Sequence, residues 1–246
     1  MDLEVLDYIN LGGSVVKCYL YNNCSHKDCD KEFCLRKFKT DVLYDYSLLT
    51  ERQKNHIELT LIGDSPLDRK DLDAYKRLAS ISDNILDFIN DGCSLYLYSK
   101  ISGNGKTSWS IRLIQSFFNK IWLKSDTKCR AMFISVPKFL IELKASFDEP
   151  NEYIDFIKKN ILEADLVVWD DIAAKPSTDF EANYLLNLID NRISYGKSNI
   201  YTSNLTPKEA IVSLGSRLCS RICNLSENIE LFGTDKRNLA LAKGEE

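Results

Sequence analysis

Apolar positions between residues 72 and 232 follow two spacings, one typical of amphipathic helices and one typical of buried strands. In residues 72–90 and 109–121, apolar side chains return every three or four positions, which predicts two helices. Short segments rich in apolar residues predict strands at 94–98, 131–136, 166–169 and 199–203, and a last strand is expected near 228–232. Further helices are expected at 138–146, 150–162, 178–193, 207–213 and 216–223. Strands that alternate with helices predict an α/β domain with a parallel central sheet covered on both faces.

The composition is that of a folded protein. Of the 246 residues, 44% are hydrophobic and 11% aromatic, which is ample for a packed core. A formal net charge of −4 argues against a surface coated in positive charge, but it leaves room for a local basic groove. The apolar runs are shorter than the ~20 residues of a membrane span, and the N-terminus lacks a signal-peptide pattern. We therefore expect a cytoplasmic protein that does not bind membranes.

Residues 93–107 have the pattern of a buried strand that runs into a phosphate-binding loop. Lys106 is placed to reach the β- and γ-phosphates of a nucleotide, and the Thr107 hydroxyl to ligate Mg²⁺. The pattern usually has a glycine where this chain has Lys100. This lysine could stiffen the turn or add a phosphate contact, and we expect it to affect hydrolysis more than nucleotide binding. The predicted nucleotide-binding residues of the loop are Ser102, Gly103, Asn104, Gly105, Lys106, Thr107 and Ser108.

Polar side chains follow two of the predicted strands. Asp170 and Asp171 end the apolar run at 166–169, and ligands of open α/β sheets bind at the carboxyl ends of strands. We expect Asp170 to hold Mg²⁺ through water and Asp171 to orient or deprotonate an attacking water. An ordinary Asp-Asp turn is the alternative. Asn204, after the strand at 199–203, could contact the γ-phosphate or that water, or could merely cap the next helix.

The cysteines are unevenly distributed along the chain. Four of the eight lie within seventeen residues near the N-terminus: Cys18, Cys24, Cys29 and Cys34. Thiolates suit tetrahedral Zn²⁺, and His26 could replace one of them, whereas four unrelated surface thiols are the alternative. So small a module would depend on the metal for folding. The sequence therefore predicts a zinc-binding module at 1–45, a linker at 46–70 and the α/β domain at 71–246.

Four motifs occur in a fixed order along the α/β domain. They are Gly-Asn-Gly-Lys-Thr at 103–107, Val-Val-Trp-Asp-Asp-Ile at 167–172, Thr-Ser-Asn at 202–204 and Leu-Gly-Ser-Arg-Leu-Cys-Ser-Arg-Ile at 214–222. This order resembles AAA+ helicase loaders of the DnaC/DnaI type, most closely the phage-encoded members, over roughly residues 70–240. The resemblance implies a P-loop ATPase domain that binds ATP or ADP with Mg²⁺ and helps place a DnaB-type hexameric helicase on single-stranded DNA in the bacterial cytoplasm, including that of a phage-infected host.

The resemblance also implies roles for individual residues. Lys106 and Thr107 match Walker A, Asp170 and Asp171 match Walker B, and Asn204 matches sensor 1. Arg221 matches the arginine finger that acts on a neighbouring protomer, with Arg217 as the other candidate, and Arg237 matches a C-terminal basic element that faces the nucleotide. Helices between 137 and 162 correspond to an insertion that lines the DNA-binding surface, with phosphate contacts expected from Lys138, Lys144, Lys158 and Lys159. The N-terminal zinc module of DnaI-type loaders contacts the helicase, although a zinc ribbon that binds nucleic acid is a competing role.

Two other functions stay open at this stage. One is an IstB-like transposition helper, which has a similar AAA+ core but is not expected to carry a zinc module. The other is a nucleotide-dependent binding switch with negligible hydrolysis, which Lys100 favours. The adenine pocket cannot be placed from the sequence.

Overall fold

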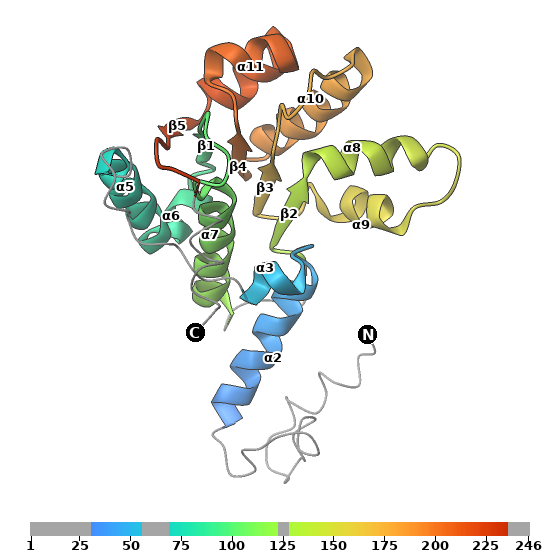
Figure 1. Ribbon diagram of the computed structural model, residues 1–246. Coiled ribbons are helices and arrows are strands. Elements are labelled where there is room, and N and C mark those ends of the chain that lie inside the picture. Colours follow the sequence, from blue (N-terminus) through green and yellow to red (C-terminus); the bar gives the residue numbers. More distant parts are fainter. Residues whose placement is uncertain (1–30, 56–68, 123–127, 236–246) are drawn as a thin grey trace, which may run out of the picture.

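A five-stranded parallel sheet forms the centre of the molecule. The computed structural model describes residues 31–55, 69–122 and 128–235 (Figure 1). The strands have the order β2-β3-β4-β1-β5 and pair in parallel throughout. Each predicted strand is confirmed to within two residues at either end: β1 (Ser94–Tyr98), β2 (Ala131–Ser135), β3 (Leu166–Asp170), β4 (Ser198–Ser203) and β5 (Glu227–Glu230).

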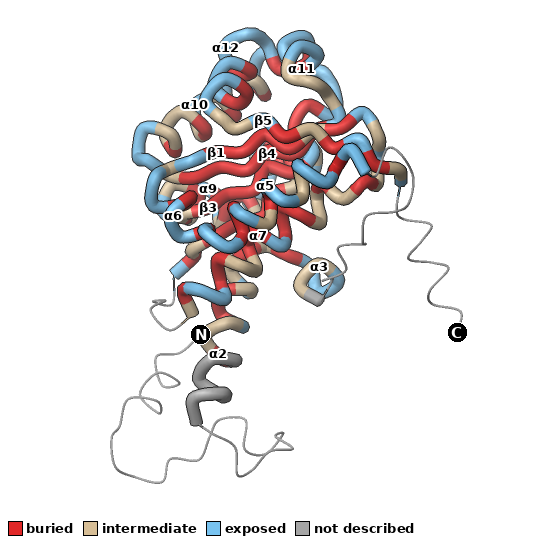
Figure 2. Tube along the Cα trace, turned by 90° about the vertical axis from the view of Figure 1, so that its left-hand side faces the viewer, coloured by how far each residue is buried: buried red, intermediate tan, exposed pale blue. Residues whose placement is uncertain are grey.

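Helices cover both faces of the sheet, as the alternating pattern predicts, and the buried residues gather between the layers (Figures 1 and 2). One face packs against α5 (Leu72–Asp83), α6 (Ile85–Asn90) and α7 (Lys106–Ile121). The other packs against α8 (Val136–Ala145), α9 (Glu152–Asn160), α10 (Asp179–Ser194), α11 (Pro207–Leu214), α12 (Ser216–Cys219) and the π-helical turn η1 (Ser220–Asn224). None of the described helices is long and apolar enough to cross a membrane.

Two helices differ from the sequence prediction. The segment 72–90 is broken at Asn84, whose backbone leaves the helical range with φ −110° and ψ 32° and whose side-chain amide donates to the Ser80 carbonyl. The expected helix at 216–223 changes from an α-turn to a π-turn at Ser220. Within this widened turn, the buried thiols of Cys219 and Cys223 lie 3.5 Å apart.

The chain before the sheet also contributes to the core. Helix α2 (Lys31–Asp45) and helix α3 (Glu51–Asn55) precede the sheet. Leu43 is buried against the same cluster as α7, and the Tyr44 ring makes an edge contact with Phe118 at 5.2 Å. The Phe133 N–H of β2 donates to the Ser47 carbonyl at 2.7 Å. Residues on both sides of position 45 therefore pack against the α/β domain.

Candidate nucleotide-binding site

The loop between β1 and α7 has the backbone conformation that its glycines predict. Gly103 and Gly105 have positive φ angles of 75° and 105°, which side chains other than glycine rarely adopt. Helix α7 begins at Lys106 directly after this loop, with Gly105 as its N-cap. The unpaired N–H groups of a helix start and the positive end of its dipole attract anions. The loop therefore has the form of a phosphate-binding site.

Lys106 is held inside the loop. Its side chain is buried (6% exposed), and Nζ lies 3.1 Å from the Ile101 carbonyl and 3.4 Å from Asn104 Oδ1. The Asn104 amide is in turn fixed by the Ser99 hydroxyl at 2.6 Å. The ammonium group is therefore already positioned where phosphate oxygens would enter the loop.

Three oxygen-bearing side chains meet beside the loop. The Thr107 hydroxyl donates to Asp170 Oδ1 at 2.9 Å, and the Thr202 hydroxyl donates to the same oxygen at 2.7 Å. Oxygen donors of this kind suit Mg²⁺, so the residues fit the predicted ion. Thr202 is not among the residues predicted from the sequence, although it lies near the end of β4, next to β3, where such a residue would be expected.

Asp170 has an altered acidity. Burial raises the pKa of its carboxyl group to about 6, and the nearby Asp171 carboxylate acts in the same direction. The hydroxyls of Thr202 and Thr107 and the charge of Lys106 oppose this rise in the pKa. Burial outweighs them because the Asp170 side chain is almost wholly removed from water, with 8% exposed. The ionised carboxylate is therefore destabilised until a cation binds beside it.

The raised pKa of Asp170 predicts a pH-dependent gain in stability for Asp170→Asn without metal. The neutral carboxyl group of Asp170 contributes its full stability below pH 3.8, the pKa of an aspartate in the unfolded chain. This contribution is lost as the pH rises through about 6, the pKa in the folded protein. Asn keeps an acceptor oxygen for both hydroxyls and never ionises. We expect its free energy of unfolding to exceed that of the wild type by about 1–3 kcal/mol at pH 8 and to match it near pH 4.

Urea denaturation in EDTA at both pH values measures this difference. Asp148→Asn removes one negative charge at an exposed turn and serves as the control. An Asp170→Asn protein that is no more stable than the wild type at pH 8 would contradict the assignment of a destabilised, buried carboxylate.

Asp171 and Asn204 lie at the same edge of the sheet as the loop. Asp171 is exposed and takes a left-handed conformation, with a φ of 55°, and its N–H donates to the Thr202 hydroxyl at 2.9 Å. Asn204 follows β4 directly and is also exposed. Because β4 lies between β1 and β3 and all three strands are parallel, both residues follow strands that end on the same side as the phosphate loop. The positions agree with the predicted catalytic roles, which stay predictions.

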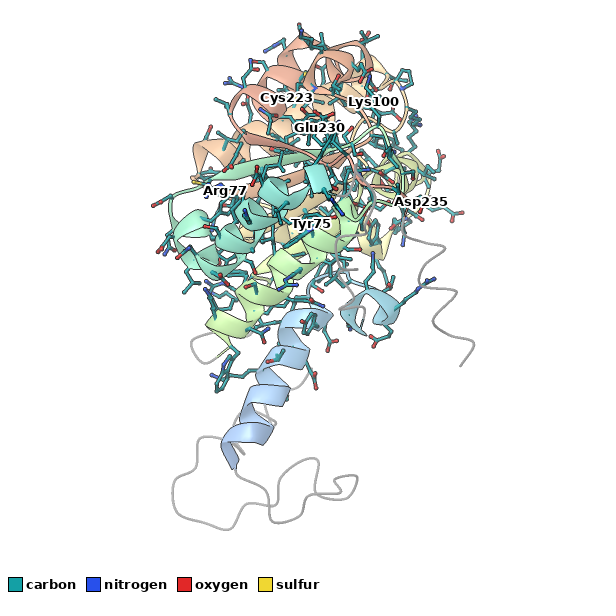
Figure 3. The ribbon with its side chains drawn as sticks, turned by 60° about the vertical axis from the view of Figure 1, so that its left-hand side comes forward. Tyr75, Arg77, Lys100, Cys223, Glu230 and Asp235 are labelled. Atoms are coloured by element: carbon teal, nitrogen blue, oxygen red, sulfur yellow. The ribbon has the colours of Figure 1, made fainter. Side chains whose placement is uncertain are left out.

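Lys100 points away from the loop and pairs with α11. Its Nζ lies 3.1 Å from Glu209 Oε1, and both side chains are partly exposed. Figure 3 labels Lys100 near the upper end of the molecule. Glu209 also closes the capping box of α11 with Thr206. Outside glycine, the described residues with positive φ are Leu48, Asp171 and Ala173, so position 100 does not need a glycine for its backbone. This arrangement offers no support for a direct phosphate contact by Lys100.

The remaining predicted site residues lie elsewhere. Arg221, in the π-turn, is exposed and pairs with Asp190 of α10 at 2.7 Å, and Arg217 is also exposed.

Arg237 lies outside the described residues. The same holds for Cys18, Cys24, Cys29 and His26, and of Cys34 only the helical backbone of α2 is described. Among the described residues, no three His, Cys, Asp or Glu side chains form a metal-binding group, so the zinc module stays a prediction.

An exposed aromatic cluster lies beyond the nucleotide site, where α8 and α10 meet. The rings of Phe147 and Phe180 make an edge contact at 5.6 Å, with 65% and 45% of these residues exposed. Lys144 and Lys175 reach the buried Glu181 at 3.0 and 3.4 Å from two sides. The sequence predicted a role for Lys144 but missed the two phenylalanines, which are 33 positions apart and meet only in the fold.

No family model matches this chain, and no curated protein matches it. Solved structures share its fold. A crystal structure of the DnaC helicase loader superimposes with a TM-score of 0.58 at 19% identity, covering 74% of this chain and 99% of that one. A crystal structure of DnaI gives 0.57 at 18% identity, covering 78% and 95%. DnaA from Aquifex aeolicus bound to AMPPCP gives 0.55 at 17% identity, covering 80% and 56%. The chain therefore has the AAA+ P-loop fold.

Proposed function

We propose that this protein is an AAA+ ATPase that helps to deposit a DnaB-type replicative helicase on single-stranded DNA. The observation that carries the nucleotide chemistry is the meeting of Thr107, Asp170 and Thr202 next to the buried ammonium of Lys106. The similarity to structures of helicase loaders supports the choice of partner. The predicted N-terminal zinc module would contact the helicase.

Each residue of the site has a part in hydrolysis under this proposal. Lys106 and the backbone N–H groups of the loop bind the phosphates and balance their charge. Thr107 and Asp170 would hold Mg²⁺, which neutralises charge on the β- and γ-phosphate oxygens when it is bound. Asp171, exposed at the strand end, orients the attacking water and accepts its proton. Asn204 contacts the γ-phosphate or that water from the neighbouring strand.

Self-association completes the site. Arg221 is exposed on the surface of the protomer, and under this proposal it leaves its ion pair with Asp190 to reach a neighbour's γ-phosphate, where an arginine stabilises transition-state charge. Two apolar side chains of α11, Ile211 and Val212, are also exposed, at 48% and 87%. Exposed apolar residues of this kind favour a protein–protein contact at α11.

The cluster of Phe147, Phe180, Lys144 and Lys175 supports an interaction with single-stranded DNA. Aromatic rings stack on bases without regard to sequence, and nearby lysines contact the phosphate backbone. Both lysines form ion pairs with Glu181, the residue that follows Phe180. The other predicted lysines gain less support: Lys138 Nζ packs over the Tyr153 ring, 4.6 Å from its centroid.

This DNA surface predicts a specific loss of binding. We expect Phe147→Ala together with Phe180→Ala to weaken binding to a fluorescent oligo-dT by roughly 10- to 100-fold, because one base stacked on this ring pair contributes about 1–3 kcal/mol. Fluorescence anisotropy at fixed salt measures the affinity, and ATP binding should stay unchanged. Tyr195→Ala, which removes an exposed aromatic ring at the other end of α10 from Phe180, is the control. Unchanged oligo-dT affinity in the double variant would remove the DNA surface from the proposal.

A loading assay separates the proposal from its alternatives. The helicase should unwind circular DNA coated with single-strand-binding protein only when this protein and ATP are present. Equal loading by wild type and Asp171→Asn would favour the nucleotide-dependent switch without hydrolysis. Stimulation of a transposase, with no effect on the helicase, would favour the IstB-like helper.

A further inference from the structure

The five residues that follow β5, residues 231–235, pass beside the phosphate loop. Figure 3 labels Glu230, the last residue of β5, and Asp235, the last residue of this stretch. The Leu231 N–H donates to the Tyr98 carbonyl at the end of β1, at 2.9 Å. The Leu231 carbonyl accepts from the Asn104 amide of the loop at 3.2 Å. The chain after β5 is therefore attached directly to the loop that is expected to bind phosphate.

A buried carboxylate fixes the next two residues. Asp71, fully buried before the start of α5, accepts from the Phe232 N–H at 2.6 Å and from the Gly233 N–H at 2.9 Å. A buried carboxylate is costly unless it is well bonded, and bonds from N–H groups to a carboxylate are stronger than those between neutral groups. Asp71 thus determines the path of the backbone at residues 232–233.

The result is a fixed aromatic ring at the edge of the site. Leu231 is buried in the core, whereas 38% of Phe232 is exposed. Lys70 Nζ lies 6.0 Å from the centroid of the Phe232 ring and brings a positive charge to the same place. We propose that Phe232 is the surface on which the purine base of the bound nucleotide stacks, and that Asp71 is the residue that positions it. This inference rests on the proposed binding of ATP by the loop.

The reach of a nucleotide favours this position. The base is joined to the phosphates through one ribose, so it must lie close to the loop that holds them. Phe232 is one residue away from the carbonyl that Asn104 contacts. The more exposed aromatic residues in the described ranges, Phe147, Phe180 and Tyr195, lie at the end of α8, in α10 and just after α10. Each carboxylate oxygen of Asp71 accepts a hydrogen bond from a backbone N–H group. We therefore assign the contact with the base to the Phe232 ring and not to the Asp71 carboxylate.

Comparison of two ligands tests the inference in the full-length protein. We expect Phe232→Ala to raise the Kd for ATP about tenfold, because it removes a stacked base, and to leave the Kd for inorganic tripolyphosphate unchanged. Phe232→Trp, which keeps an aromatic face, should bind ATP within about twofold of the wild type. Asp71→Asn should weaken the binding of ATP and leave the binding of tripolyphosphate unchanged. If this variant of a buried residue does not fold, the comparison of Phe232→Ala with Phe232→Trp decides the test. Tyr195→Ala is the control.

The outcomes distinguish this inference from the proposal beneath it. If the wild type binds neither ATP nor tripolyphosphate, the proposed nucleotide function fails. If the wild type binds ATP and Phe232→Ala binds it equally well, the base lies elsewhere and this inference is overturned. Equal weakening of ATP and tripolyphosphate by Phe232→Ala would also overturn it, because the ring would then act on the phosphate loop.

Discussion

Lys106→Ala should weaken ATP binding by roughly 10- to 100-fold, since a hydrogen bond to a charged group contributes about 1.5–3 kcal/mol. The ammonium of Lys106 is buried inside the loop, within 3.4 Å of Asn104 Oδ1, and phosphate oxygens would replace these internal acceptors. The fold should survive, because Asn104 is held separately by Ser99 and the Leu231 carbonyl. Calorimetric titration with ATP and Mg²⁺ measures the affinity.

Lys100→Ala is the matched control for Lys106→Ala. Both variants remove one lysine from the same loop region, but the Lys100 ammonium is partly exposed and pairs with Glu209. Exposed ion pairs contribute about 0–1 kcal/mol, so we expect ATP affinity to change less than about threefold in this variant. If both variants lose affinity equally, general electrostatic attraction explains binding, and the specific role of Lys106 is wrong.

Arg192→Met should lower the free energy of unfolding by about 3–5 kcal/mol, the effect of breaking a buried, charged hydrogen-bond network. Arg192 is fully buried at the end of the sheet opposite the nucleotide site. Its guanidinium donates to Asn199 Oδ1 at 2.8 Å and to the carbonyls of Ala164, Ser198 and Ile161. Methionine fills similar space but leaves these acceptors unsatisfied.

Thermal and urea denaturation at pH 7.5 test this expectation. Burial lowers the pKa of Arg192 to about 10, so the group is still charged at this pH. The control is Arg77→Met, which removes an arginine bonded to both Glu227 oxygens at 2.7 and 2.8 Å but largely exposed to solvent. We expect the control to lose less than about 1 kcal/mol. A loss of similar size in both variants would show that burial of Arg192 does not determine its contribution.

Local patterns in the sequence were sufficient for the strands, most helices and the phosphate loop. Each of these features depends on neighbouring residues: apolar periodicity for the elements, and glycines followed by Lys-Thr for the loop. The parallel sheet then requires the ends of β1, β3 and β4 to meet, which brings Asp170, Asp171 and Asn204 to the loop without further information.

Contacts between distant segments could not be predicted in this way. Asp71 and Phe232 are 161 positions apart, and nothing near either residue signals the hydrogen bond between them. Arg192 looks in the sequence like an ordinary polar residue near the end of a helix, and only the fold shows that it is buried. Lys100 looked like a defect of the loop, but its partner Glu209 becomes visible only when α11 is placed beside it.

Parallel measurement of ATP binding and phosphate release for wild type and Asp171→Asn tests most directly whether this site hydrolyses ATP. Asparagine suits the left-handed backbone at this position, with its φ of 55°, so the fold should be kept. With single-stranded DNA present, we expect ATP affinity within about threefold of the wild type and phosphate release at least ~100-fold slower, because the group that orients and deprotonates water is lost. Equal rates of phosphate release in the two proteins would contradict the account.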